Sequence, residues 1–172
     1  IPSSPTSGGG FKKPNDESTG DSHFWQVWHG LKPFEEYQNH KFRFCSEFGF
    51  ESFPDIKTVK LFADSELNPF SDIMEKHQKC ADGNARILYH ISKNYLNPAN
   101  FEDFIYISQI LQNDSIKFNV EHLRRNRGVC MGALYWQIND CWTGISWSSI
   151  DYAGRWKALH YGAKRFFAPV II

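Results

Sequence analysis

The chain has 172 residues, and its 19 lysines and arginines balance its 19 aspartates and glutamates, so the formal net charge at pH 7 is zero. This balance argues against a general electrostatic grip on nucleic acid or on an anionic membrane. No apolar run approaches the length of a membrane span. Aromatic residues make up 16% of the chain, which predicts a large aromatic core or a site with flat stacking surfaces.

The cysteines are scattered, and no two of them have the close spacing of a zinc or redox motif. Free thiols are therefore expected, which favours a reducing, cytoplasmic location. His77 and Cys80 share a predicted helix face without further ligands nearby, so we expect no metal and no other cofactor. The first residues, IPSSPTSGGGFKK, do not resemble a signal peptide and lack an initiator methionine. We expect the chain to be a piece of a longer protein.

The predicted elements follow from turn residues, caps and the spacing of apolar residues. In chain order they are a Gly-rich loop at 1–21 that includes Gly8 to Gly10, a strand at 22–29, a short helix at 32–40, a strand at 42–48, a helical turn after Pro54, helices at 70–79 and 84–96, a long helix at 100–128, a buried strand at 131–138 and a helix at 155–167.

Local signals fix the long helix best. Asn100 is a candidate N-cap, and Gly128 fits the C-terminal end. Strands that alternate with helices indicate parallel βα units, and three such units predict part of a doubly wound α/β sheet or part of a barrel. In both architectures a site lies where the parallel strands end.

Polar and aromatic residues gather at the ends of the three predicted strands: His29, then Ser46 and Glu47, then Trp136, Asn139 and Asp140. A carboxylate inside a strand is costly unless it is paired or performs chemistry. A carboxylate can attack an anomeric carbon, and a tryptophan face can support the C–H surface of a sugar. These residues predict a sugar site. A structural ion pair of Glu47 with Arg43 and simple core packing of Trp136 remain as alternatives.

Other catalytic signatures are missing from the sequence. It contains no G-x-S-x-G, G-x-G-x-x-G or P-loop motif. The basic stretch HLRRNRG, residues 122–128, is explained by its position at the C-terminal end of the long helix, where the helix dipole is negative.

Three long motifs carry a resemblance: GDSHFWQVWHG, RFCSEFGFESFP, and MGALYWQINDCW followed by SWSSIDYAGRWKALHYGAKRFFAPV. In order and spacing they are similar to the C-terminal half of the catalytic barrel of β-mannosidases, in glycoside hydrolase family 2. The resemblance implies an α/β fold, with this chain forming about strands 6–8 of a (β/α)8 TIM barrel. Residues 1–168 would belong to the barrel, and residues 169–172 would begin the linker to a following β-sandwich domain.

The resemblance also implies roles for single residues. Glu47, in the SEFG motif, corresponds to the nucleophile of a configuration-retaining glycosidase. His29 is expected close to it, and Trp136 is expected to line the sugar subsite. The remaining residues expected at the substrate are Trp25, Asn139, Asp140 and Trp142. The expected partner is a β-mannoside oligosaccharide, with no cofactor, nucleic acid or membrane.

One departure from the family pattern is important. The acid/base glutamate of the family lies in an Asn-Glu pair, and this sequence contains no such dipeptide. Retaining hydrolysis needs two carboxyl groups about 5–5.5 Å apart. The isolated chain is therefore expected to be inactive and to require the rest of the barrel and the flanking β-sandwich domains. A β-galactosidase or β-glucuronidase specificity and a non-catalytic carbohydrate-binding fragment are the alternatives.

Overall fold

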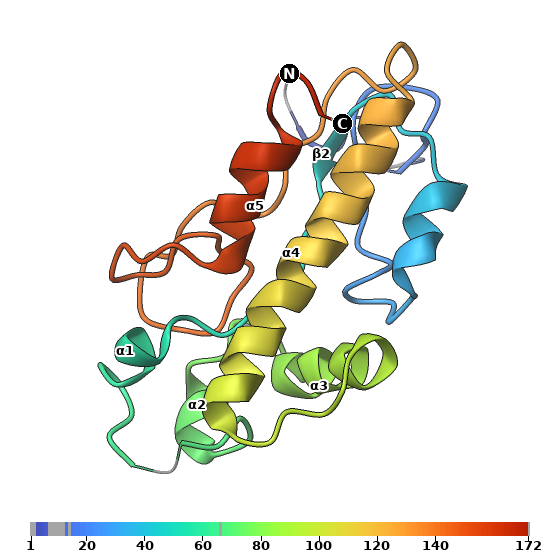
Figure 1. Ribbon diagram of the computed structural model, residues 1–172. Helices are drawn as coiled ribbons and strands as arrows, with labels where there is room; N and C mark the ends of the chain where they lie inside the picture. Colours follow the sequence, from blue (N-terminus) through green and yellow to red (C-terminus); the bar gives the residue numbers. More distant parts are fainter. Residues whose placement is uncertain (1–2, 7–12, 14, 66, 172) are drawn as a thin grey trace. The chain divides into compact units, whose positions relative to one another are not determined.

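The computed structural model describes residues 3–6, 13, 15–65 and 67–171 and shows mixed α/β content (Figure 1). The chain divides into two compact units. Unit 1 comprises residues 1–49 and 116–136, and unit 2 comprises residues 50–115 and 137–172. Gly8 to Gly10 of the predicted loop, and Ile172 at the end of the predicted linker, lie outside the described residues.

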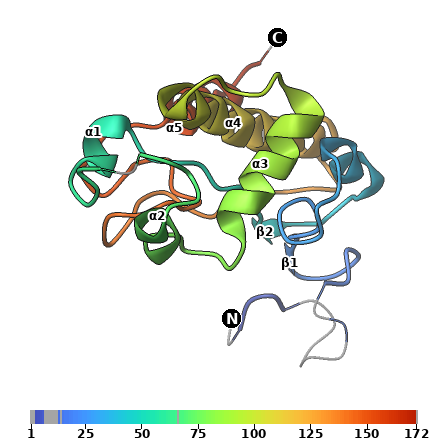
Figure 2. The same ribbon diagram turned by 90° about the horizontal axis from the view of Figure 1, so that it is seen from below.

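Unit 1 contains a small parallel sheet. Strand β1 (Ser22–His23) pairs with β2 (Cys45–Glu47), and the two strands lie side by side in Figure 2. The segment 131–136 runs parallel to the other side of β2 through isolated bridges at Ala133 and Trp136. The spatial order is therefore β1, β2 and then 131–136, which follows the order of the predicted strands along the sequence.

The strands are shorter than predicted. β1 ends at His23 because the chain then turns, with the His29 N–H donating to the Trp25 carbonyl at 2.7 Å. The prediction of a buried strand at 131–138 is wrong. This segment is extended but forms only bridges, and Met131, Leu134 and Trp136 are 69%, 57% and 43% exposed. Their backbone N–H groups donate toward β2, and no strand among the described residues adjoins the segment's other edge.

Aromatic side chains form the core of unit 1. A 3₁₀ helix, η2 (Phe34–Asn39), replaces the predicted helix at 32–40 and directs Phe34 and Tyr37 inward. Trp28, Phe42 and Phe48 are at most 1% exposed. The high aromatic content therefore serves the core as well as the surface.

Unit 2 contains the remaining helices. They are α1 (Ile56–Val59), α2 (Asp72–Lys76), α3 (Gly83–Asn94), the N-terminal part of α4 (Phe101–Arg125) and α5 (Ala158–Phe166). Asn100 caps α4 as predicted, because its Oδ1 accepts the Asp103 N–H at 2.9 Å. In the described part of the chain, no helix has the length and apolar character needed to cross a membrane.

Candidate active site

Glu47 is the carboxylate that the sheet presents at its end. The parallel register places His23 of β1 beside it, and His23 Nδ1 lies 3.1 Å from Glu47 Oε2. The Trp25 indole N–H donates to the same oxygen at 3.0 Å. The Glu47 side chain is 23% exposed. Oε2 therefore contacts both an imidazole nitrogen and an indole N–H, whereas Oε1 has no hydrogen bond from any described residue.

The structural alternative for Glu47 was an ion pair with Arg43. Arg43 is exposed, and its backbone N–H donates to the carbonyl of Glu17 at 3.3 Å. Within the described residues, the ion-pair partner of Glu47 is His23. The carboxylate is thus held by an imidazole and an indole.

A second carboxylate, Asp21, lies behind this pair. Asp21 Oδ2 accepts the hydroxyls of Ser4 at 2.6 Å and Ser46 at 2.5 Å. Asp21 Oδ1 accepts the backbone N–H and the hydroxyl of Thr6 at 2.7 and 2.5 Å. Burial alone would raise the pKa of Asp21, but the hydrogen bonds from Ser4, Ser46 and Thr6 outweigh it and hold that pKa far below its usual value. Asp21 is therefore a fixed anion.

The other predicted residues of unit 1 are His29 and Trp136. The His29 ring packs on the Trp25 ring, with 5.2 Å between centroids, so it contacts the indole that binds Glu47. Trp136 forms a parallel bridge with Gly49 and is 43% exposed. Unit 1 thus joins the predicted Glu47, Trp25 and His29 in one chain of contacts.

Asn139, Asp140 and Trp142 belong to unit 2. Asn139 is exposed. Trp142 is 40% exposed and stacks on His77, with 5.0 Å between ring centroids, while Lys79 Nζ lies 4.4 Å from its centroid. Asp140 is 7% exposed, and its Oδ2 accepts hydroxyls from two serines, Ser146 at 2.9 Å and Ser148 at 2.6 Å. The Asp140 carboxylate is therefore committed to the loop that follows it.

Unit 2 also contains a buried charged cluster that the sequence did not reveal. Lys157 is 1% exposed and donates to the carbonyl oxygens of Ser52 and Ser146 at 3.0 and 3.2 Å. Burial lowers the pKa of Lys157 to about 8, although Asp140 and neighbouring acids raise it. Glu51 is 0% exposed, and burial raises its pKa well above the ordinary value against the opposing effect of Lys157. Glu47 and Glu51 are only four residues apart, yet the Glu47 side chain is partly exposed and Glu51 is fully buried.

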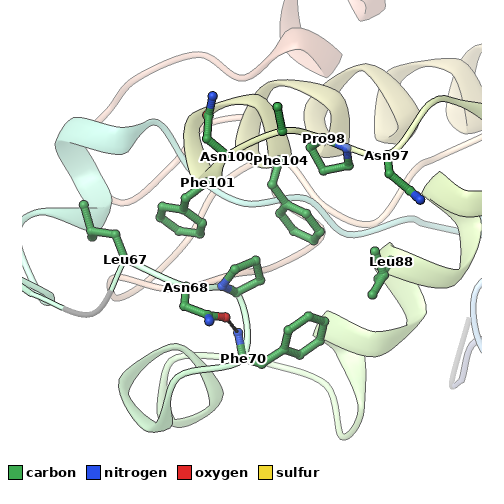
Figure 3. Close-up of a pocket in the computed structure, with 11 residues that line it drawn as sticks. Leu67, Asn68, Phe70, Leu88, Asn97, Pro98, Asn100, Phe101 and Phe104 are labelled. Carbon is green, nitrogen blue, oxygen red and sulfur yellow. Dashed lines mark hydrogen bonds between the residues drawn. The ribbon is translucent and has the colours of Figure 1, made fainter.

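Unit 2 carries a surface pocket of about 350 Å³, in which Figure 3 shows Phe101 and Phe104 of α4 together with Phe70. Its amides are largely used locally. Asn68 Oδ1 accepts the Phe70 N–H at 2.8 Å, and Asn100 caps α4. The pocket therefore offers apolar contact without a catalytic group, and the Glu47 site is the better candidate.

No metal centre is evident in the described ranges, where no three potential ligands from His, Cys, Asp and Glu come together. The chemistry that this site offers is that of a partly exposed carboxylate that contacts the His23 ring and accepts the Trp25 indole N–H, with the His29 ring packed on that indole.

Comparison with known proteins identifies the kind of protein that carries these motifs. The chain is 37% identical over 179 residues to β-mannosidase B of Aspergillus niger, an alignment that covers 99% of this chain and 21% of that protein. It is 36% identical over 192 residues to the β-mannosidase of the goat, Capra hircus, with 99% and 22% covered. The chain is related to the β-mannosidases. It spans about a fifth of the length of these relatives.

A solved structure supports the relationship with the β-mannosidases. The crystal structure of the β-D-mannosidase from Dictyoglomus thermophilum matches with a TM-score of 0.88 and 41% identity, covering 92% of this chain and 20% of that one. No protein-family model matches the chain. The resemblance to β-mannosidases that the three motifs indicated is confirmed.

His23 is the residue of this β-mannosidase-like site that the sequence reading missed. Asp21, His23 and Trp25 alternate along an extended segment, so their side chains point to the same face. That alternation was visible in the motif GDSHFW. His29 ends the predicted strand, whereas the observed strand ends at His23.

Proposed function

We propose that the full-length protein containing this chain is a retaining β-mannosidase of glycoside hydrolase family 2, with Glu47 as its nucleophile. The observation that carries the proposal is the geometry of Glu47: it is partly exposed, its Oε2 accepts from Trp25 and faces His23, and its Oε1 is available. A carboxylate that must attack carbon needs one oxygen oriented and the other accessible. The relationship to β-mannosidases supplies the reaction.

In this mechanism, ionised Glu47 attacks the anomeric carbon of a terminal β-mannoside through Oε1. The bond to the leaving oxygen breaks as a carboxylic acid supplied by another part of the protein protonates that oxygen, and a glycosyl ester of Glu47 forms. The same acid, now a carboxylate, takes a proton from water, and the water oxygen attacks the anomeric carbon and releases Glu47.

The remaining predicted residues have proposed supporting roles. The exposed indoles of Trp136 and Trp142 are suited to the apolar faces of sugar rings, and Asn139 to a sugar hydroxyl. Trp25 acts mainly through Glu47, and His29 through Trp25. The buried carboxylate of Asp140 holds its own loop through two serine hydroxyls.

We further propose that β1, β2 and the segment 131–136 are the sixth, seventh and eighth strands of a (β/α)8 barrel. Their parallel order in unit 1 supports this assignment. The acid/base glutamate would then lie in the earlier strands, so the 172-residue chain alone would bind no substrate productively. The rest of the barrel and the flanking β-sandwich domains complete the enzyme.

The direct test is to trap the glycosyl ester. In 2-deoxy-2-fluoro-β-mannosyl fluoride, the fluorine at C2 slows both steps while the good leaving group permits the first. Fluoride departs as Glu47 Oε1 bonds to the anomeric carbon. Mass spectrometry of the digested full-length protein should find the added sugar on the peptide that contains Glu47. Labelling of a different carboxylate would refute the assignment.

Substitution provides the second part of the test. Glu47→Gln should lower kcat on aryl β-mannosides by several orders of magnitude without changing the thermal unfolding temperature. Glu35→Gln makes the same change of charge at an exposed position of η2 and should leave kcat unchanged. A panel of aryl β-mannosides, β-galactosides and β-glucuronides separates the specificities, and preference for either of the latter two would replace the mannosidase assignment.

A further inference from the structure

Close polar contacts link four side chains of the site, in the order Asp21, Ser4, His23 and Glu47. The Ser4 hydroxyl donates to Asp21 Oδ2 at 2.6 Å and lies 2.9 Å from His23 Nε2. On the other side of the ring, His23 Nδ1 lies 3.1 Å from Glu47 Oε2. Each member thus contacts the next from a different segment of unit 1.

The direction of these bonds fixes one proton on His23. Asp21 is an anion that accepts from four donors, so it has no proton to give. A hydroxyl has a single proton, and that of Ser4 is committed to Asp21. Ser4 Oγ therefore meets His23 Nε2 as an acceptor, and Nε2 must carry a hydrogen.

The other ring nitrogen then decides the charge of His23. If the ring were neutral, Nδ1 would direct its lone pair at the carboxylate oxygen 3.1 Å away. Only the imidazolium can donate from both nitrogens at once. The charged and titratable groups that face the ring are Glu47 of β2 and, through Ser4, Asp21; Asn15 accepts the His23 backbone N–H at 3.0 Å. Both titratable neighbours are acids, and both favour the imidazolium.

We propose that Asp21 and Ser4 hold His23 as an imidazolium against Glu47, and that His23 is thereby a positioning residue that keeps the nucleophile ionised and oriented. This inference rests on the proposed function and adds a regulating group to the same site. His23 does not react with substrate. It orients Oε2 together with Trp25, so that Oε1 is the oxygen turned to the sugar.

The test is the dependence of kcat/KM on pH for the full-length protein with an aryl β-mannoside. In His23→Asn, an amide nitrogen replaces Nδ1 as a donor but brings no charge. Because a neighbouring cation favours an ionised carboxylate, its loss should move the acid limb of the profile to higher pH by about one unit. At pH values well below the midpoint of the acid limb this corresponds to about a tenfold lower kcat/KM, with a smaller loss at the optimum.

Ser4 gives a milder variant that does not touch Glu47. Ser4→Ala removes the acceptor for Nε2 and frees the ring to donate from Nδ1 while neutral, so the acid limb should move in the same direction by less. Ser4→Thr restores the hydroxyl and should restore the profile. Ser3→Ala changes an exposed neighbouring serine and is the matched control, which should show no shift.

The outcomes distinguish this inference from the proposed function. If the fluorosugar labels Glu47 but the acid limb stays in place in both His23→Asn and Ser4→Ala, the positioning role is refuted alone. A uniform loss at every pH, accompanied by a lower unfolding temperature, would also refute it, because a purely structural histidine gives that result. If His23→Asn does not fold, the Ser4 variants decide. If Glu47 is not labelled, the proposed function itself fails.

Discussion

The buried carboxyl of Glu51 offers a test in which replacing a buried residue is expected to stabilise the protein. Glu51 is 0% exposed, and burial holds its pKa well above the ordinary value of 4.5, against the smaller opposing effects of Lys157 and of a hydrogen bond from the Gln78 side chain. The folded protein therefore keeps a proton on Glu51 at pH values where the unfolded chain has lost it. An acid of this kind makes folding less favourable as pH rises above 4.5, by up to about 1.4 kcal/mol per pH unit.

Glu51→Gln replaces the acid with a neutral side chain of the same shape, so this cost disappears. Over the roughly 2.5 pH units between the ordinary value and pH 7, the variant should gain up to about 3 kcal/mol over the parent protein. The gain should vanish near pH 4.5, where both forms of the protein bury a neutral group. The mutation is thus expected to stabilise the protein and to flatten its dependence on pH.

The assay is thermal unfolding between pH 4.5 and 8, comparing the parent protein, Glu51→Gln and Glu35→Gln. The exposed Glu35 should give no pH-dependent difference. A Glu51→Gln variant that is less stable than the parent protein at pH 7, or whose unfolding temperature changes with pH as steeply, would show that Glu51 is ionised in the folded state.

Two further predictions concern single hydrogen bonds. Trp25→Phe keeps an aromatic ring but removes the indole donor to Glu47. A hydrogen bond to a charged group contributes about 1.5–3 kcal/mol, so kcat should fall about 10- to 150-fold. An unchanged kcat would show that the bond does not orient the nucleophile. Thr58→Val removes the buried hydroxyl that donates to Asp151 Oδ2 at 2.6 Å, and should lower the stability by about 1–3 kcal/mol in thermal unfolding, whereas Thr58→Ser should recover it.

The helices were predictable because their signals are local. Asn100 caps the N-terminus of α4 as expected, and the predicted helix at 100–128 compares with Phe101–Arg125 in the structure. Gly128, three residues beyond, has φ of +105°, which glycine adopts without strain. Caps and turn residues carry their information within a few positions of the chain.

The strands were harder because pairing depends on residues far away in the sequence. The aromatic run after His23 has high strand propensity, yet it turns and packs inward as Phe24, Val27 and Trp28 become buried. The segment 131–136 reads as apolar and therefore buried, but whether it is covered depends on what lies at its outer edge.

The sequence predicted the central carboxylate of the candidate site but not the side chains that hold it. Glu47 stands out because a carboxylate inside a strand demands an explanation, and the motifs around it led to the β-mannosidases. The roles of His23, Asp21 and Ser4 could not be read from the sequence alone. They arise because parallel pairing and a loop more than fifteen residues upstream bring these side chains to one carboxylate.

The exposed edge of the segment 131–136 has a practical consequence for anyone who produces the chain by itself. Its backbone is hydrogen-bonded toward β2, while Met131, Leu134 and Trp136 are presented to water. An open, apolar strand edge recruits strands from other molecules, so the isolated polypeptide should accumulate in inclusion bodies or as soluble oligomers during expression.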